Sequence, residues 1–103
     1  NASVLGLVGV GAGLAPYVAA KHGVVGLGRA AALEYAASGI RINTIAPAGV
    51  DTPQYRATFG AAREPHDVFV GMHPVGRLAT PEEIASLVLY LASDQAGFFS
   101  GTA

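Results

Sequence analysis

Three polar side chains near the start of the chain could carry out proton transfer together. Tyr17 and Lys21 are four residues apart, and Ser3 stands fourteen residues before the tyrosine. In an α-helix, residues four apart lie on one face, one turn from each other. A cation beside a phenol stabilises the phenolate, so such a tyrosine could exchange a proton near neutral pH. The Ser3 hydroxyl, at the end of a neighbouring strand, could hold a carbonyl or alcohol oxygen beside them.

A long helix must present Tyr17 and Lys21, and the sequence predicts one over about residues 15–37. Pro16 suits the first helical turn, and Gly39 is a good C-terminal stop. Apolar residues cover much of the predicted helix, and three glycines in its middle would let another helix approach closely. We therefore expect this helix to be buried on more than one side, by its own sheet and by a partner helix.

Short apolar segments on either side of this helix predict strands, at residues 1–7 and 40–46. A helix between two such strands is a βαβ crossover, which implies that the strands are parallel. The glycine-rich residues 9–13 predict a loop, and residues 98–103 should lead into a last strand. The pattern indicates an α/β fold with a parallel sheet, and no domain boundary lies within residues 1–103.

The connection over residues 48–76 holds three prolines and no long periodic run. A long connection of this kind in a compact domain is typical of a lid or binding loop, here with short helices. We expect Asp51 to cap a short helix that follows Pro53, because aspartate is a preferred N-cap residue.

A second amphipathic helix is predicted from Thr80 to about Ser93, with apolar residues at helical spacing. A threonine followed by proline and two glutamates is a strong helix start. Glu82 and Glu83 would then complement the helix dipole. Arg77 could anchor the preceding loop or reach a partner, and the sequence leaves both open.

The chain is unusually apolar. It is 51% hydrophobic and only 13% charged, against a typical charged fraction of about 25%. It is therefore either the buried part of a larger protein or the carrier of a membrane segment. Residues 2–20 lack charge and are long enough to span a membrane, but their four glycines and one proline favour a strand end and a loop. Both ends of the sequence have the character of a fragment.

Charge and cysteine content argue against nucleic-acid binding, disulfides and thiolate metal sites. The net charge is −1 and the basic residues are scattered, so no nucleic-acid footprint is evident. The absence of cysteine excludes disulfides and thiolate metal sites, and it fits a reducing compartment. The three histidines, His22, His66 and His73, lack metal-site spacing, so we expect no metal.

Several segments, in order and over nearly all 103 residues, resemble the C-terminal half of the short-chain dehydrogenases/reductases. The segments that carry the resemblance are residues 1–3, 17–27, 39–47, 51–53, 74–85 and 100–103. A lone Y-x-x-x-K pair would be a weak signal, whereas this series at family spacing is a strong one.

The resemblance implies an incomplete Rossmann-like α/β fold, a doubly wound parallel sheet of which residues 1–103 form the C-terminal catalytic half. It also implies NAD(P)-dependent interconversion of an alcohol and a carbonyl. Ser3 matches the serine that hydrogen-bonds the substrate oxygen, and Tyr17 matches the general acid/base. Lys21 matches the lysine that binds the nicotinamide ribose and stabilises the ionised tyrosine.

For the cofactor, NAD or NADP, the resemblance implies further contacts. Pro47, Ala48 and Val50 match the segment against the nicotinamide amide, and Thr52 matches a threonine near that amide or the pyrophosphate. Ala48 stands where the family usually has glycine, and Gly49 follows it. No G-x-G-x-x-G turn occurs in the chain, so the half that grips the pyrophosphate and selects NAD or NADP is absent.

The resemblance further implies a cytoplasmic homo-oligomer, a dimer or tetramer, that acts on a small alcohol or ketone without binding nucleic acid or membrane. We expect the 103-residue chain alone to be inactive. Two alternatives stay open. One is a non-catalytic fragment or oligomerisation half, in which the two long helices serve as interfaces. The other is a membrane-anchored protein that uses residues 2–20.

Overall fold

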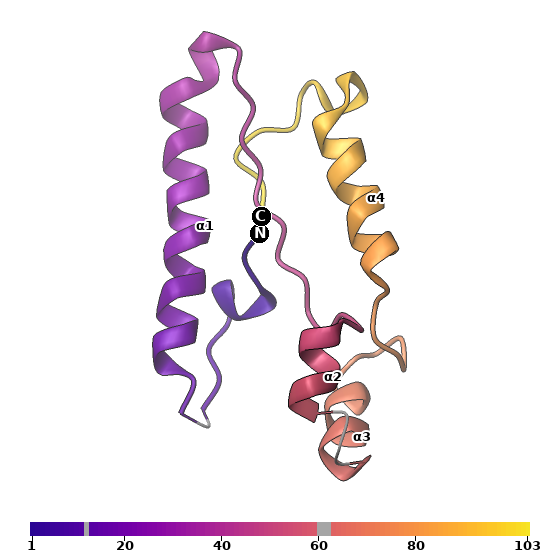
Figure 1. Ribbon diagram of the computed structural model, residues 1–103. Helices are drawn as coiled ribbons and strands as arrows, with labels where there is room; N and C mark the ends of the chain where they lie inside the picture. Colours follow the sequence, from indigo (N-terminus) through magenta and orange to yellow (C-terminus); the bar gives the residue numbers. More distant parts are fainter. Residues whose placement is uncertain (12, 60–62) are drawn as a thin grey trace. The chain divides into compact units, whose positions relative to one another are not determined.

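The structure is a computed structural model that describes residues 1–11, 13–59 and 63–103, without the side chains of residues 63–65 (Figure 1). Its elements in chain order are η1 (Val4–Gly6), α1 (Ala15–Tyr35), η2 (Ala36–Ser38), α2 (Pro53–Phe59), α3 (Arg63–Gly71), α4 (Pro81–Ala92) and η3 (Asp94–Ala96). The chain divides into two compact units, residues 1–47 with 88–103 and residues 48–87. The predicted loop at 9–13 and the connection at 48–76 include residues 12 and 60–62, which lie outside the described residues.

Helix α1 begins and ends where the sequence predicts. Pro16 stands in its first turn, where its missing N–H removes no helical bond. The helix tightens into the 3₁₀ turn η2, and Gly39 ends it with a left-handed φ of 74°. The Gly39 N–H donates to the carbonyl of Ala36 (3.0 Å). These signals are local, so the sequence alone could place both ends.

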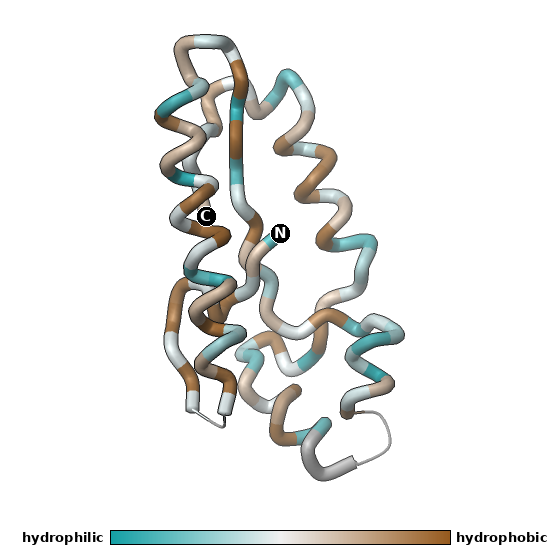
Figure 2. Tube along the Cα trace, turned by 60° about the vertical axis from the view of Figure 1, so that its left-hand side comes forward, coloured by the Kyte–Doolittle hydropathy of each residue, from teal (hydrophilic) through white to brown (hydrophobic). Residues whose placement is uncertain are grey.

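The prediction that α1 is buried on several sides is wrong for this chain. Only Val25 and Ala32 of the helix are buried, whereas Leu27 and Leu33 are 70% and 84% exposed. Apolar residues recur along the whole helix, with hydrophilic residues between them (Figure 2). A single narrow stripe of α1 is therefore in contact with the rest of its unit.

That stripe packs on residues 40–47 through a glycine. A Cβ added at Gly28 would overlap the hydroxyl of Thr44, which is buried. Gly23 and Gly26 face open space, with nothing within 4 Å of an added Cβ. Of the three glycines expected to admit a partner helix, one instead admits an extended segment of the same unit.

The strands predicted at residues 1–7, 40–46 and 98–103 are not formed as regular strands, and no strand is assigned within the described ranges. Extended main chain is present: the Ala2 N–H donates to Ile45 O (2.8 Å), and the Thr44 N–H donates to Thr102 O (2.9 Å). A strand needs a continuous ladder of such bonds. The Val4 N–H also donates to Pro47 O (2.9 Å), but Pro47 has no N–H to donate in return, so this pairing is incomplete.

Residues 4–6 coil instead of extending, because a side chain competes for the main chain. The Ser3 hydroxyl accepts a hydrogen bond from the Leu5 N–H (3.2 Å) and caps η1. This local bond explains why the predicted strand over residues 1–7 is replaced by a 3₁₀ turn.

Arg41 closes the first unit in a way that the sequence analysis missed. Its guanidinium donates to the carbonyls of Leu91 (2.8 Å), Ser93 (3.1 Å) and Phe99 (3.3 Å). These carbonyls lie at and beyond the C-terminal end of α4, where a cation is favourable to the helix dipole. Arg41 thereby ties residues 91–99 to the extended segment after α1.

In the second unit, two short helices form within the long connection, as predicted. Tyr55 of α2 is buried, and its ring lies 5.1 Å from that of Phe59 and 5.6 Å from that of Phe69 in α3, measured between centroids. The expectation that Asp51 caps α2 is wrong. The Thr52 hydroxyl accepts from the Tyr55 N–H (3.1 Å), and Asp51 instead pairs with Arg56.

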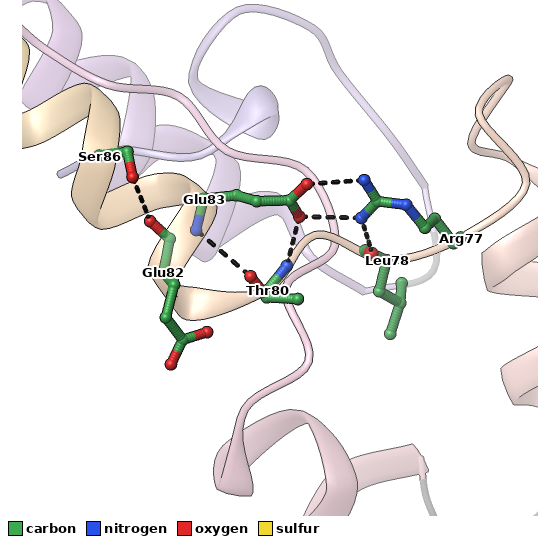
Figure 3. A network of polar contacts seen from close by, with 6 residues as sticks. All are labelled: Arg77, Leu78, Thr80, Glu82, Glu83 and Ser86. Atoms are coloured by element: carbon green, nitrogen blue, oxygen red, sulfur yellow. Dashed lines mark hydrogen bonds and ion pairs between the residues drawn. The ribbon is translucent and has the colours of Figure 1, made fainter.

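The N-terminus of α4 is held by the predicted capping box (Figure 3). The Thr80 N–H donates to the Glu83 carboxylate (2.8 Å), and the Glu83 N–H donates back to the Thr80 hydroxyl (3.3 Å). Arg77 adds a two-pronged ion pair with Glu83, at 2.8 and 2.6 Å. The hydrogen bonds that Glu83 accepts from Arg77 and, to a smaller extent, from the Thr80 N–H lower its pKa to about 2. Arg77 thus anchors its own loop.

Within the described part of the chain, no helix combines the length and the apolar character that a bilayer crossing requires. Residues 2–20 do not form one helix, because α1 begins only at Ala15.

Candidate active site

Tyr17 and Lys21 lie on one face of α1, in its first two turns. The Lys21 ammonium nitrogen stands 5.5 Å from the centroid of the Tyr17 ring. This distance is within the range of a cation–π contact. Tyr17 is 44% exposed, so its side chain is open to a reactant. The arrangement places a positive charge beside an accessible phenol, as the four-residue spacing predicts.

Ser3 is positioned by the turn that it caps. Its oxygen accepts from the Leu5 N–H, and the next residue binds the extended segment, because the Val4 N–H donates to Pro47 O (2.9 Å). Ser3 itself is half-buried. The serine hydroxyl is therefore held by main-chain contacts on both sides rather than by its own side-chain packing.

Gly6 brings this turn against α1, and the sequence analysis did not single it out. A Cβ added at Gly6 would lie 2.7 Å from the Lys21 carbonyl oxygen and 3.0 Å from Val25 Cγ2. Distances below 3.0 Å to main-chain atoms cannot be relieved by a rotamer change. The turn that carries Ser3 and the helical turn that carries Lys21 are thus in direct contact. A glycine three residues after the serine was the available signal.

The residues predicted to contact a cofactor amide fall in both units. Pro47 belongs to the first, where its carbonyl accepts from Val4. In the second unit, Val50 forms a parallel β-bridge with Ala79, and Ala48 is exposed. The Thr52 oxygen accepts from Tyr55, which leaves the hydroxyl proton of Thr52 available for another acceptor.

Gly49 is closely surrounded by side chains of the second unit. A Cβ added there would lie 2.6 Å from Leu78, 2.7 Å from Phe69 and 2.8 Å from His73 Nε2. The Gly49 N–H donates to His73 Nε2 (2.8 Å), and its carbonyl accepts from the Ala79 N–H (3.0 Å). The Ala48 side chain is exposed, whereas a side chain at position 49 would have to displace those of Leu78, Phe69 and His73.

Charged groups beside this segment pair with each other. Arg56 donates two hydrogen bonds to Asp51, at 2.7 and 2.8 Å, and these lower the pKa of the carboxyl. Burial, with smaller effects of Asp51 and Asp67, raises the pKa of Tyr55, whose hydroxyl lies 2.9 Å from His66 Nδ1. Asp51 is therefore a structural partner of Arg56.

The histidines do not gather. His22 contacts the Val18 carbonyl on α1, while His66 and His73 are bound within the second unit. Among the side chains of residues 1–11, 13–59 and 66–103, no three histidine, aspartate or glutamate residues are grouped as a metal site would need.

Comparison with known proteins adds to this geometry. A family model described as "Enoyl-(Acyl carrier protein) reductase" matches residues 1–103. The chain is 50% identical over 102 residues to the cyclohexanol dehydrogenase of Acinetobacter sp. (strain SE19). It is also 40% identical to a short-chain dehydrogenase, fogB, of Aspergillus ruber, over 101 residues. The chain belongs to the short-chain dehydrogenase/reductase family.

Another family member, the cis-4-hydroxycyclohexanecarboxylate dehydrogenase of Sinomonas cyclohexanicum, is 46% identical over 99 residues. The matches cover 99% and 96% of this chain, but only 38% of the cyclohexanol and cis-4-hydroxycyclohexanecarboxylate enzymes. The chain thus spans well under half the length of these short-chain dehydrogenase/reductase relatives.

Two solved structures of the family share the fold of this chain. Levodione reductase superposes with a TM-score of 0.88 and 40% identity, over 98% of this chain and 41% of the reductase. A protein described as an NAD(P)-dependent gluconate 5-dehydrogenase from Beutenbergia cavernae, with NADP bound at low occupancy, superposes with a TM-score of 0.89 and 40% identity. That match covers 98% of this chain and 40% of the other. The arrangement of helices and extended segments is therefore that of short-chain dehydrogenases/reductases.

Proposed function

We propose that the protein containing this chain is an NAD(P)-dependent oxidoreductase that interconverts an alcohol and a carbonyl. The observation that carries the proposal is the Lys21 ammonium over the Tyr17 ring, on a helix that contacts the turn of Ser3. Two relatives are named for hydroxylated six-membered carbon rings, which supports a cyclic secondary alcohol or its ketone as substrate.

Tyr17 is the general acid/base in this proposal. It donates its phenolic proton to the carbonyl oxygen during reduction and accepts the alcohol proton during oxidation. Tyr17 is a phenolate whenever it has given up its proton. Lys21 stabilises that phenolate, because a nearby cation favours the charged form.

Ser3 holds the substrate oxygen. A hydroxyl has one proton to donate and two lone pairs to accept with. The oxygen of Ser3 already accepts from the Leu5 N–H, so its own proton remains for the substrate oxygen. A donor aimed at an oxygen that gains negative charge favours reaction in the same way as an oxyanion hole.

The donor set suits the nicotinamide half of NAD or NADP, which supplies or accepts the hydride when bound. In the first unit, the Lys21 ammonium would donate to ribose hydroxyls beside Tyr17, and Pro47 would border the amide. In the second, the main chain at Ala48 and Val50 and the free hydroxyl proton of Thr52 offer polar contacts. The glycine-rich turn that would bind the pyrophosphate of the cofactor does not occur in this sequence.

An assay of the full-length protein with cyclohexanol and either NAD or NADP tests the proposal. We expect reduced nicotinamide to form with one of them, and cyclohexanone to be reduced in the reverse direction. The 103-residue chain alone should give no turnover and little cofactor binding. An absence of any NAD(P)-dependent reaction with a panel of cyclic and acyclic alcohols and ketones would refute the activity.

A second role rests on exposed apolar side chains. Leu27 and Leu33 of α1, Leu89 of α4 (71% exposed) and Phe98 (fully exposed) are large apolar residues at the surface of the first unit. We propose that they contribute to a homodimer or homotetramer in the cytoplasm. Light scattering of the full-length protein measures the oligomer size. A monomer at assay concentration would contradict this role without affecting the proposed chemistry.

A further inference from the structure

We infer that His73 is a positioning residue, which as a neutral imidazole holds the main chain of Gly49 and thereby makes cofactor binding sensitive to pH. The inference rests on the proposed function, since Ala48, Val50 and Thr52 flank Gly49 in the segment assigned to the cofactor. His73 acts through Gly49 and does not itself contact the substrate.

The hydrogen bonds of His73 assign its protonation state. Nδ1 lies 2.9 Å from the Phe69 carbonyl oxygen, which can only accept, so Nδ1 carries the proton. Nε2 lies 2.8 Å from the Gly49 nitrogen, which can only donate, so Nε2 must be unprotonated. Both partners are satisfied together only by the neutral Nδ1–H tautomer.

The hydrogen bond from the Gly49 N–H to His73 lies in a closely packed environment. Gly49 is buried, and the side chains of Leu78, Phe69 and His73 leave no room for a Cβ. Its carbonyl is held by Ala79, so the bond to His73 is the one that secures its N–H. Three residues further on, Thr52 caps α2. The intervening main chain is held by the Gly49 contacts and by the Asp51 N–H, which donates to Ala79 O (2.9 Å).

Protonation of His73 would turn its acceptor into a second donor. The Gly49 N–H would then face an N–H, and a buried donor without a partner is costly. The described groups in contact with the ring of His73 are Gly49 and Phe69, whose ring centroid lies 5.2 Å away, and Leu78 lies against Gly49 beside them. None of these three titrates.

The other charged or titratable side chains that the structure describes near Gly49 and His73 have partners. His66 bonds to Tyr55, Asp51 to Arg56, and Arg77 to Glu83, while Asp67 interacts with Tyr55. The charge on His73 itself is therefore the change that should loosen Gly49 as the pH falls.

The first experiment needs no cofactor. Nitrogen NMR of the full-length protein should show the Nδ1–H tautomer of His73 at neutral pH. The Gly49 amide signal should shift with the same midpoint as the imidazole when the pH is lowered. An Nε2–H tautomer, or a Gly49 amide that ignores the titration of His73, would overturn the inference.

The second experiment measures the dissociation constants of NADH and NADPH against pH, with kcat followed separately. In the wild type, the constant for the cofactor that binds should rise roughly 3- to 10-fold as His73 becomes protonated, the equivalent of one hydrogen bond. His73→Gln keeps an acceptor near the Nε2 position that does not titrate, so its affinity should lose that pH step. His73→Phe should bind weakly at every pH.

His22→Gln is the matched control, because His22 also contacts the carbonyl four residues before it, at 3.0 Å from Val18 O, but contacts no glycine. It should retain the wild-type pH step. Identical pH steps in the wild type and His73→Gln would overturn the inference. If the NMR result is as expected but neither NADH nor NADPH binds at any pH, the proposed function fails instead, and with it the cofactor part of this inference.

Discussion

The region around Tyr17 and the region around Gly49 are built in opposite ways. Tyr17 is exposed, Lys21 is half-buried, and the main chain of Lys21 is in contact with Gly6. At Gly49 the main chain is enclosed, and side chains of Leu78, Phe69 and His73 set its position. The region around Tyr17 leaves polar side chains available for chemistry. The region around Gly49 uses its polar side chain, His73, to hold the main chain.

The comparison predicts where a substitution will change chemistry without changing stability. Tyr17→Phe removes an exposed hydroxyl, so the full-length protein should keep its thermal midpoint while kcat falls by about 10²- to 10⁴-fold, the usual contribution of a general acid/base. Steady-state kinetics and a thermal melt measure both quantities.

Tyr35→Phe is the control for Tyr17→Phe. Tyr35 lies at the other end of α1 and is similarly exposed, 47% against 44%. It should retain full turnover. Equal losses of turnover in the two variants would show that the effect is not specific to Tyr17. Full turnover by Tyr17→Phe would refute its assignment as the general acid/base.

Gly6→Ala should damage both stability and chemistry, because the added methyl meets the Lys21 carbonyl at 2.7 Å. Overpacking against rigid atoms typically costs about 1–3 kcal/mol. Urea unfolding should show this loss, and turnover should fall as the Ser3 turn is pushed from α1.

Gly23→Ala provides the contrast on α1 itself. Its added methyl meets nothing within 4 Å, so the helix should gain up to about 1 kcal/mol from the better propensity of alanine. Stability that changes in the same direction in Gly6→Ala and Gly23→Ala would contradict the contact proposed for Gly6.

The smallest effect concerns acid and the start of α4. The pKa of Glu83 is lowered from 4.5 to about 2 in the folded protein. A lowered pKa stabilises the fold fully above the unfolded value, so this contribution should weaken below about pH 4.5 and vanish as the pH falls through about 2. Amide exchange at the first turn of α4 reports the loss.

Glu83→Gln should lose that acid dependence, whereas Glu82→Gln should keep it, because the Arg77 and Thr80 contacts belong to Glu83 alone of this pair. A first turn of α4 that responds to acid equally in both variants would show that the ion pair does not stabilise it.

Local signals in the sequence predicted the parts of the fold that depend on neighbouring residues. Pro16 and Gly39 predicted the bounds of α1, and Thr80 with Glu83 predicted the start of α4. The one-face pairing of Tyr17 and Lys21 follows from helical spacing in the same way. The wrong prediction of the α2 cap also concerned neighbouring residues. Asp51 and Thr52 are both good N-cap residues, and Thr52 caps the helix because Asp51 is paired with Arg56.

Contacts between distant residues could not be predicted in this way. The strands predicted at residues 1–7 and 40–46 depended on partners along the whole of each segment, and the observed pairs are sparse. The enclosure of Gly49 depends on Phe69, His73 and Leu78, which lie 20 to 29 positions further along the chain.

By itself, the sequence determined the long helices and the adjacency of a phenol and an ammonium, since these follow from spacings of three and four residues in a helix. Only the tertiary structure decided that Gly6 seats the serine turn on Lys21 and that His73 binds Gly49, because residues far apart in sequence meet only when the main chain between them has folded.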